Sequence, residues 1–294
     1  ANMLRQAGAR FGSIVRQAPC VGQGGAGDGP GSRRPGPGGL GMVRWSQEGG
    51  HMQYGAVLEA EFLSRPNRFV AWCRLDGETV LAHVKNTGRC RELLYPGARV
   101  LLQRSPGEQR RTTYTLLSVW KGDRLVNIDS QAPNALFREA RAAGTLDLPG
   151  RLRSEVRFGG SRFDFLLEPA DGPPRFIEVK GVTLEEKGVA LFPDAPTDRG
   201  TRHLRELVRA LDAGYGALVV FVVQMEGVVV FRPNDRMDPA FGAALREAAA
   251  RGVGVLALAC RVEPGDLRIQ SPVPVDLGVN PGTKSGLAQP EREG

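Results

Sequence analysis

The sequence predicts a mixed α+β fold, with a small β-barrel followed by an α/β domain. Three observations lead to this prediction. Between residues 54 and 128, short alternating apolar runs are separated by turn residues, which is typical of a small all-β unit. From residue 133 onward, helical and strand-like patterns alternate, which is typical of an α/β domain. Within that part, residues 217–224 are almost continuously apolar, as expected of a buried central strand.

The composition fits a globular protein of one or two domains. The chain has 294 residues, of which 41% are apolar and 24% are charged. No run approaches the roughly 18 apolar residues that a membrane-spanning helix needs. We therefore expect no membrane partner.

The net charge of +7 is unevenly distributed. Residues 1–51 carry a surplus of four positive charges, residues 52–133 carry another four, and residues 134–294 are nearly neutral. A basic first half favours a nucleic-acid partner. The alternative is an arginine-rich proteome in which isoelectric points are generally high.

The barrel prediction rests on five strands in about 75 residues, a number that suits the OB type. The turn Asp76-Gly77 is a strong hairpin signal between two of them. The expected strands are residues 56–62, 69–75, 79–84, 99–103 and 112–120.

Two loops of the expected barrel combine basic, amide and aromatic side chains, a mixture that suits contacts with a nucleic-acid backbone and base stacking. The candidate DNA-binding residues are Arg65, Asn67, Arg68 and Phe69 in the first loop, and Lys85, Asn86, Thr87 and Arg89 in the second. The alternative is that the asparagines fill turn positions and the basic side chains are solvated.

The second domain is expected to contain three helices and five strands. The helices are residues 133–144, 201–213 and 238–251, and the strands are 153–158, 162–167, 176–180, 217–224 and 253–260. Pro133 suits the first turn of the first helix, which also carries Glu139.

The candidate catalytic residues are Asp164, Glu178, Lys180 and Glu139. Side chains alternate across a strand, so Glu178 and Lys180 share one face, and a neighbouring strand would place Asp164 beside Glu178. Two carboxylates can bind Mg²⁺ or Mn²⁺, and a lysine can hold a phosphate or help to activate water. The pattern resembles the metal site of the PD-(D/E)XK nuclease superfamily, with Asp164 and Glu178 as metal ligands and Glu139 in the outer coordination. The alternative is an ion pair that orders the core.

More specifically, the chain resembles the sugar fermentation stimulation protein A (SfsA) family over residues 52–276. The stretches that carry the resemblance are residues 64–69, 83–94, 161–167, 178–184 and 190–204. The resemblance implies an N-terminal OB-like domain, a nuclease-like domain, sequence-nonspecific DNA binding and a regulatory role in sugar, notably maltose, metabolism. In the last stretch, Arg199 and His203 are expected to touch the DNA backbone.

These observations predict four segments. Residues 1–51 are expected to form a disordered Gly/Pro-rich extension. It is explained either as a targeting peptide or as an over-extended start of the sequence, and in the second case Met52 would be the natural first residue. Residues 52–132 form the DNA-binding barrel, 133–276 the nuclease-like domain and 277–294 a disordered tail. The four cysteines show neither metal-ligand spacing nor a disulfide framework, which favours reduced thiols and a cytoplasmic location.

Two functions follow from this organisation. One is a sequence-nonspecific DNA-binding protein of the sugar fermentation stimulation type, with a nuclease-like metal site and a regulatory role in sugar metabolism. The alternative is an active Mg²⁺-dependent DNA nuclease that cuts phosphodiester bonds. No small-molecule cofactor beyond the metal is expected.

Overall fold

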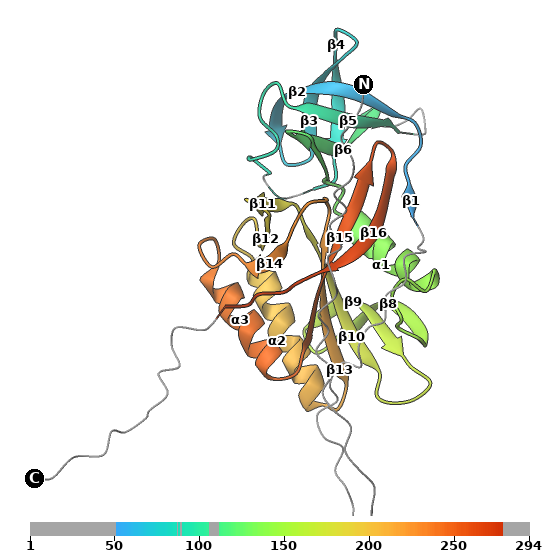
Figure 1. The fold of residues 1–294 in the computed structure, drawn as a ribbon, viewed down its shortest axis with the longest axis vertical. Coiled ribbons are helices and arrows are strands. Elements are labelled where there is room, and N and C mark those ends of the chain that lie inside the picture. The colour runs from blue at the N-terminus through green and yellow to red at the C-terminus, as the bar shows by residue number, and fades with distance from the viewer. Residues whose placement is uncertain (1–50, 87, 89, 106–111, 279–294) are drawn as a thin grey trace, which may run out of the picture. The chain divides into compact units, whose positions relative to one another are not determined.

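A computed structural model describes residues 51–86, 88, 90–105 and 112–278, and its fold is the predicted barrel followed by an α/β domain (Figure 1). The extension before His51, the tail after Gly278, and the candidate DNA-binding residues Thr87 and Arg89 lie outside the described residues. None of the described helices is long and apolar enough to cross a membrane.

Five strands close the barrel, as predicted. They follow the order β4-β3-β2-β5-β6, and β4 also pairs with β6. Their bounds are β2 (Val57–Asn67), β3 (Val70–Leu75), β4 (Glu78–Val84), β5 (Arg99–Arg104) and β6 (Tyr114–Lys121), with the short β7 (Arg124–Asn127) added to β6. Alternate residues of β3, namely Ala71, Cys73 and Leu75, are buried inside the barrel. Asp76 and Gly77 both have positive φ angles, so the hairpin signal of the sequence is confirmed.

A seven-stranded sheet forms the centre of the second domain, in the order β1-β16-β15-β13-β10-β9-β8. Its strands are β1 (Met52–Gln53), β8 (Arg151–Phe158), β9 (Ser161–Glu168), β10 (Arg175–Val182), β13 (Gly216–Val223), β15 (Gly254–Glu263) and β16 (Asp266–Val273). The pairs β10–β13 and β13–β15 are parallel. Met52 and Gln53 pair with β16, so the first strand of the chain belongs to this sheet and not to the barrel.

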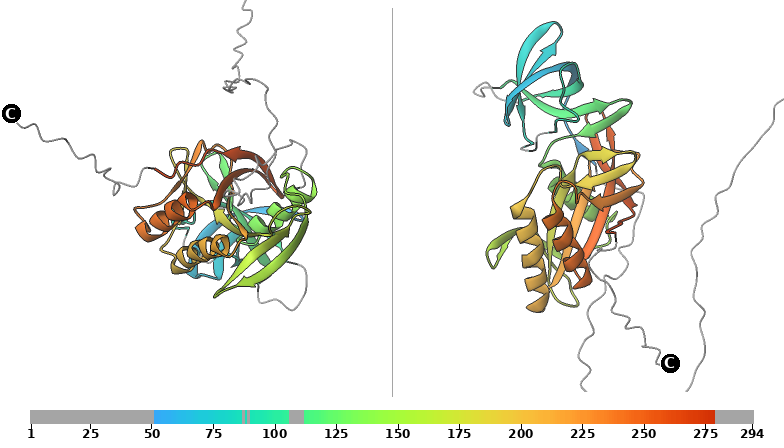
Figure 2. Two further views of the ribbon diagram at one scale, coloured as in Figure 1. Left: turned by 90° about the horizontal axis from the view of Figure 1, so that it is seen from below. Right: turned by 90° about the vertical axis from the view of Figure 1, so that its left-hand side faces the viewer.

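Three helices cover the sheet: α1 (Ala132–Ala142), α2 (Asp198–Asp212) and α3 (Pro239–Ala250). Along β13, Val219 and Phe221 pack in one apolar cluster with α2 and α3, whereas Leu218 and Val220 pack in a second cluster with α1. The helices therefore cover opposite faces of the sheet, and α2 and α3 lie side by side on one of them (Figure 2).

A small second sheet lies in segments for which the sequence predicts neither a helix nor a strand. Its strands are β11 (Leu184–Glu186), β12 (Val189–Phe192) and β14 (Val230–Pro233), in the order β11-β12-β14. Lys187 and Gly188 make the turn between β11 and β12 with positive φ angles. These strands have three or four residues, too few for a clear alternating pattern.

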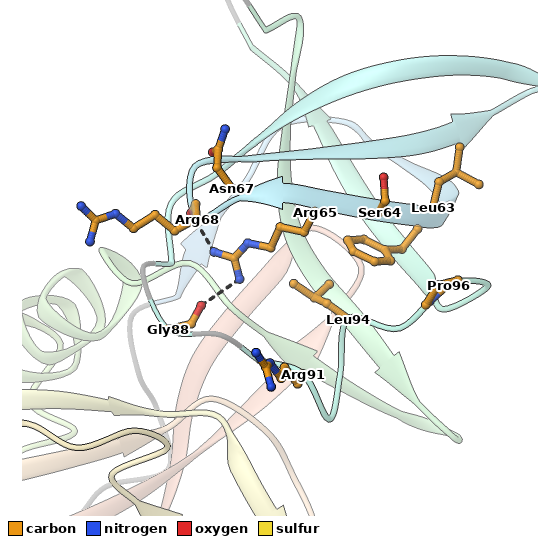
Figure 3. A pocket seen from close by; sticks show the side chains of 10 residues that line it. Leu63, Ser64, Arg65, Asn67, Arg68, Gly88, Arg91, Leu94 and Pro96 are labelled. Carbon is orange, nitrogen blue, oxygen red and sulfur yellow. Dashed lines mark hydrogen bonds between the residues drawn. The ribbon is translucent and has the colours of Figure 1, made fainter.

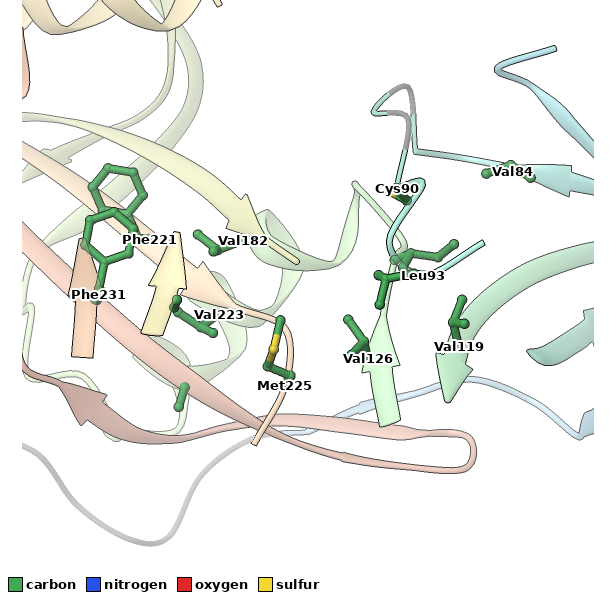
Figure 4. Packing of buried hydrophobic residues seen from close by; sticks show 14 of the residues in the cluster. Val84, Cys90, Leu93, Val119, Val126, Val182, Phe221, Val223, Met225 and Phe231 are labelled. Atoms are coloured by element: carbon green, nitrogen blue, oxygen red, sulfur yellow. The ribbon is translucent and has the colours of Figure 1, made fainter. Parts of the chain in front are cut away.

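The apolar core continues from the barrel into the second domain. One cluster of buried residues contains Leu93, Val119 and Val126 of the barrel together with Val182 and Met225 of the second domain (Figure 4). Polar contacts join the same two parts: the buried Gln224 Nε2 donates to Asn127 Oδ1 at 2.8 Å.

Candidate functional site

The candidate site lies where β9 and β10 separate. Their antiparallel pairing runs from Arg175 opposite Leu167 to Ile177 opposite Phe165, and continuing it would place Glu178 opposite Asp164. The Asp164 carboxylate instead accepts the backbone N–H of Val179 at 2.8 Å, in place of a ladder bond. The predicted neighbourhood of Asp164 and Glu178 is therefore present in the structure.

Glu178 and Lys180 lie on the face of the sheet that α2 and α3 cover. Phe176 and Val182, at the same alternating positions of β10, pack in the cluster that contains both helices. Glu178 is 3% exposed, and its Oε1 lies 2.5 Å from Lys180 Nζ. Its Oε2 is also buried, and no described residue hydrogen-bonds to it.

His203 is the second partner of Glu178. It is buried on α2 with its Nδ1 2.5 Å from Glu178 Oε1. The start of α2 is fixed by Thr197, whose hydroxyl accepts the N–H of Gly200, and Asp238 at the start of α3 accepts the N–H of Thr197. Because His203 is 3% exposed and bonded to Glu178, its observed partner is this carboxylate, and the expected contact with DNA stays a prediction.

The two carboxyl groups respond differently to this environment. Burial and the neighbouring Glu178 charge raise the pKa of Asp164, against the opposing effects of the Val179 N–H, Asn134 and Lys180. Burial alone would raise the pKa of Glu178 as well, but the hydrogen bond from His203 and the charge and hydrogen bond of Lys180 bring it below its ordinary value. The site therefore places an ionised Glu178 carboxylate beside the carboxyl group of Asp164.

Asn134 is a member of the site that the sequence analysis missed. It lies in the first turn of α1, and its Nδ2 donates to Asp164 Oδ1 at 2.8 Å. An asparagine near a helix start is common, and its partner lies 30 residues away, so no local pattern indicated this contact.

Glu139 lies on the same helix as Asn134, and its expected place in the outer coordination stays a prediction. The charged groups that affect its pKa are His51 and Arg138, whereas those that affect Asp164 are Glu178 and Lys180. At 3.6 residues per turn, Glu139 is rotated about the helix axis by about 140° from Asn134, the residue of α1 that contacts Asp164.

A groove of about 590 Å³ on the barrel brings together part of the predicted DNA-binding set (Figure 3). Its polar lining includes Arg65, Asn67, Arg68 and Arg91. Arg91 was not among the residues predicted to bind DNA, because it follows the two loops, residues 65–69 and 85–89, that supplied those candidates. Phe69 is 48% exposed, and the Arg68 guanidinium lies 4.9 Å from the centre of its ring.

Two of the predicted DNA-binding side chains, Arg65 and Lys85, bind other groups of the protein. The Arg65 guanidinium donates to the carbonyl oxygens of Gly88, Arg68 and Asn86, so it ties the two loops together. Lys85 Nζ lies 2.9 Å from the buried carboxylate of Asp129. Both side chains therefore have structural partners, in contrast to the expectation that they are available to phosphates.

The remaining predicted residues have simpler surroundings. Asn67 Oδ1 accepts the N–H of Phe69, and Asn86 Oδ1 accepts the N–H of Gly88, so both asparagines do stabilise turns. Arg199 is exposed on the first turn of α2, and its Nε lies 3.4 Å from His203 Nε2.

Together, the fold and site define a two-domain protein: a closed five-stranded barrel and an α/β domain whose separating central strands carry an Asp-Glu-Lys cluster. Family models match both parts. The "SfsA N-terminal OB domain" model matches residues 63–128, and the "Sugar fermentation stimulation protein RE domain" model matches residues 131–266. The chain belongs to the sugar fermentation stimulation protein (SfsA) family, as the sequence resemblance indicated.

Individual relatives agree with the family models. A sugar fermentation stimulation protein homolog of Desulfitobacterium hafniense is 51% identical over 226 residues, covering 77% of this chain and 99% of the relative. A homolog of Clostridium acetobutylicum is 48% identical over 221 residues, covering 74% and 96%. The structure of Pyrococcus furiosus SfsA in complex with Ca²⁺ superimposes with a TM-score of 0.70 at 30% identity, covering 76% of this chain and 98% of that one.

Proposed function

We propose that this protein binds DNA without sequence preference through its barrel and holds a divalent cation at Asp164 and Glu178. The observation that carries the proposal is the arrangement of Glu178: an ionised, buried carboxylate beside Asp164, with one oxygen bonded to Lys180 and His203 and the other without a described partner.

The donor set fits a hard cation such as Mg²⁺ or Mn²⁺. Carboxylate oxygens are the ligands that these ions prefer, and Glu178 Oε2 offers one directly. Asp164 is held by two donors and keeps further lone pairs. In the part of the chain that the structure describes, no group of three or more His, Cys, Asp and Glu side chains is arranged around one point. A cation here would keep several water ligands, as Mg²⁺ usually does. That the related Pyrococcus furiosus protein forms a complex with Ca²⁺, another oxygen-preferring ion, supports this proposal.

DNA binding rests on the groove of the barrel. Arg68 and Arg91 are exposed and line it, and the exposed Phe69 ring beside Arg68 offers a surface for a base or a sugar. Phosphate contacts position a protein on DNA without reading its sequence, which is the basis for nonspecific binding. Such a role fits a cytoplasmic location, where reduced thiols such as the buried Cys73, Cys90 and Cys260 persist.

Phosphodiester cleavage is the second candidate activity, and the position of Lys180 favours it over a purely structural metal site. When bound, the cation would supply charge stabilisation and a water of lowered pKa. Lys180, whose Nζ is held by Glu178 and whose side chain is 18% exposed, would contact the scissile phosphate or orient the attacking water. Asp164 and Glu178 would bind the cation, and His203 would hold Glu178. The alternative is a noncatalytic module that retains the metal site.

A regulatory role in sugar, notably maltose, metabolism is the part of the proposal that family membership alone supports. It would act through DNA binding and would not depend on cleavage. Comparing transcripts of sugar-utilisation genes between cells with the wild-type protein and cells with the groove variant below tests it directly.

Binding to unrelated DNA duplexes over a range of salt concentrations tests the DNA-binding proposal. We expect similar affinities for all sequences and a steep fall with salt, because each neutralised phosphate makes the slope of log affinity against log salt more negative by about 0.9. Arg68→Ala with Arg91→Ala should weaken binding and flatten the slope. Arg74→Ala is the matched control, because Arg74 is an exposed barrel arginine outside the groove, paired with Glu61. A sharp preference for one sequence, or binding indifferent to salt, would contradict the proposal.

A further inference from the structure

The two oxygens of Glu178 have different surroundings, and His203 accounts for part of the difference. Oε1 has Lys180 Nζ and His203 Nδ1 at 2.5 Å, whereas Oε2 has no described hydrogen-bond partner. A carboxylate held through one oxygen cannot turn freely about its last bond. The orientation of Glu178 Oε2, the oxygen without a described partner, is therefore fixed as well.

The proton on His203 can be placed from its neighbours. A guanidinium nitrogen only donates, so His203 Nε2, which lies 3.4 Å from Arg199 Nε, is the acceptor in that contact. In neutral imidazole the other nitrogen then carries the proton. Nδ1 therefore donates to Glu178 Oε1, and the chain of donors runs from Arg199 through His203 to Glu178.

The imidazole ring itself is fixed by packing. It meets the ring of Phe163 edge to face, with 5.8 Å between the ring centres. Lys180 cannot fix the orientation of the Glu178 carboxylate in the same way. Its side chain is flexible and only half-buried, so its ammonium group can move with the carboxylate when the carboxylate rotates. His203 is therefore the more rigid of the two partners of Oε1.

We propose that His203 is a positioning residue for the metal site, which holds Glu178 so that Oε2 points to the cation. This inference rests on the proposed function, since it needs the cation to bind at Glu178. Residues that orient metal ligands in this way typically contribute about 10–100-fold to metal affinity. The proposal gives α2 a direct part in metal binding, although none of its side chains is expected to ligate the ion.

Calorimetric titration of metal-free protein with MnCl₂ tests the inference without any assay of cleavage. His203→Leu keeps much of the side-chain volume but removes the donor. His203→Asn places an amide N–H close to the position of Nδ1. Leu207→Ala is the matched control, because Leu207 is buried on the same helix and its truncation removes apolar packing but no hydrogen-bond donor to Glu178. Glu178→Gln reports whether Mn²⁺ binds at this site at all, and circular dichroism verifies that each variant is folded.

We expect His203→Leu to weaken Mn²⁺ binding by about 10–100-fold, and His203→Asn to restore most of the loss. Leu207→Ala should bind as the wild type does. If His203→Leu binds Mn²⁺ as tightly as the wild type while Glu178→Gln does not, the positioning role is wrong and the metal site stands. Equal losses in His203→Leu and His203→Asn, or in Leu207→Ala, would also overturn it. Unchanged binding by Glu178→Gln would refute the metal site itself.

Discussion

The carboxylate of Asp164 accepts the backbone N–H of Val179, the residue that follows Glu178, at 2.8 Å. This bond forms where the ladder between β9 and β10 ends, so it satisfies a donor that the separating strands would leave unpaired. It also holds one acidic side chain directly beside another. Asp164 therefore has a structural role as well as its proposed role as a metal ligand.

Replacing Asp164 separates these two roles. Asp164→Ala leaves the Val179 N–H and the Asn134 amide without their acceptor, and should lower the free energy of unfolding by roughly 1–3 kcal/mol. Asp164→Asn keeps one acceptor oxygen and should lose less. Urea denaturation with and without MgCl₂ measures both effects, because Mg²⁺ should stabilise the wild type and neither variant. An unchanged Mg²⁺ stabilisation in Asp164→Asn would exclude this residue as a ligand.

Lys85 should matter for stability and not for DNA affinity. Its Nζ is paired with Asp129, a fully buried carboxylate, so Lys85→Met leaves that charge without its counterion. We expect a loss of about 3 kcal/mol in the free energy of unfolding, measured in urea, and DNA affinity close to that of the wild type. Arg68→Ala should show the opposite pattern. A stable Lys85→Met protein with weakened DNA binding would return Lys85 to the interface.

Because of Glu185, the free energy of unfolding should depend on pH. Burial alone would raise the pKa of Glu185, but hydrogen bonds from Lys121 and the Gly188 N–H and the charges of Lys121 and Arg124 lower it to about 2. Because the folded-state pKa lies below the ordinary 4.5, the ionised carboxylate stabilises the fold above pH 4.5. That stabilisation is lost as the pH falls from 4.5 towards 2.

The variant Glu185→Gln isolates this contribution. It cannot ionise, so it should be less stable than the wild type at pH 7, by roughly 1–3 kcal/mol, and should show a shallower dependence on pH below 4.5. Urea denaturation at several pH values compares the two. Parallel stability curves for Glu185→Gln and the wild type would mean that the pairs with Lys121 and Arg124 contribute nothing to stability.

Replacing Lys180 should affect DNA cleavage and leave DNA binding unchanged. If the protein cuts DNA, Lys180→Ala should abolish cleavage of a labelled duplex in MgCl₂, while DNA affinity stays near that of the wild type, because the groove arginines are untouched. Asp164→Ala provides the matched loss of a metal ligand. Wild-type cleavage rates in both variants would assign any observed activity to a contaminant or to another site.

The sequence was sufficient for most of the fold because the relevant patterns are local. The hairpin at Asp76-Gly77, the alternation along β3 and the apolar run of β13 each follow from a few neighbouring residues. The strands that were missed depend on distant partners: β1 pairs with β16, more than 200 residues further along the chain, and β12 pairs with β14. Short strands of this kind carry no pattern of their own.

The same distinction explains the candidate site. Strand alternation placed Glu178 and Lys180 on one face, and two neighbouring strands placed Asp164 close to them. The sequence could not show that Lys85 finds Asp129, or that His203 is buried against Glu178, because these partners lie 44 and 25 residues apart. A charged side chain cannot be recognised as paired until its partner is known, so the sequence could not separate paired from unpaired members of the predicted DNA-binding set.

The most direct test of the metal site is a crystal structure of the protein grown with MnCl₂, with anomalous scattering recorded for manganese. We expect an anomalous peak within coordination distance of Glu178 Oε2 and of Asp164, with water completing the coordination, and no such peak in Glu178→Gln. A structure with manganese bound elsewhere and Glu178 still held only by Lys180 and His203 would contradict it.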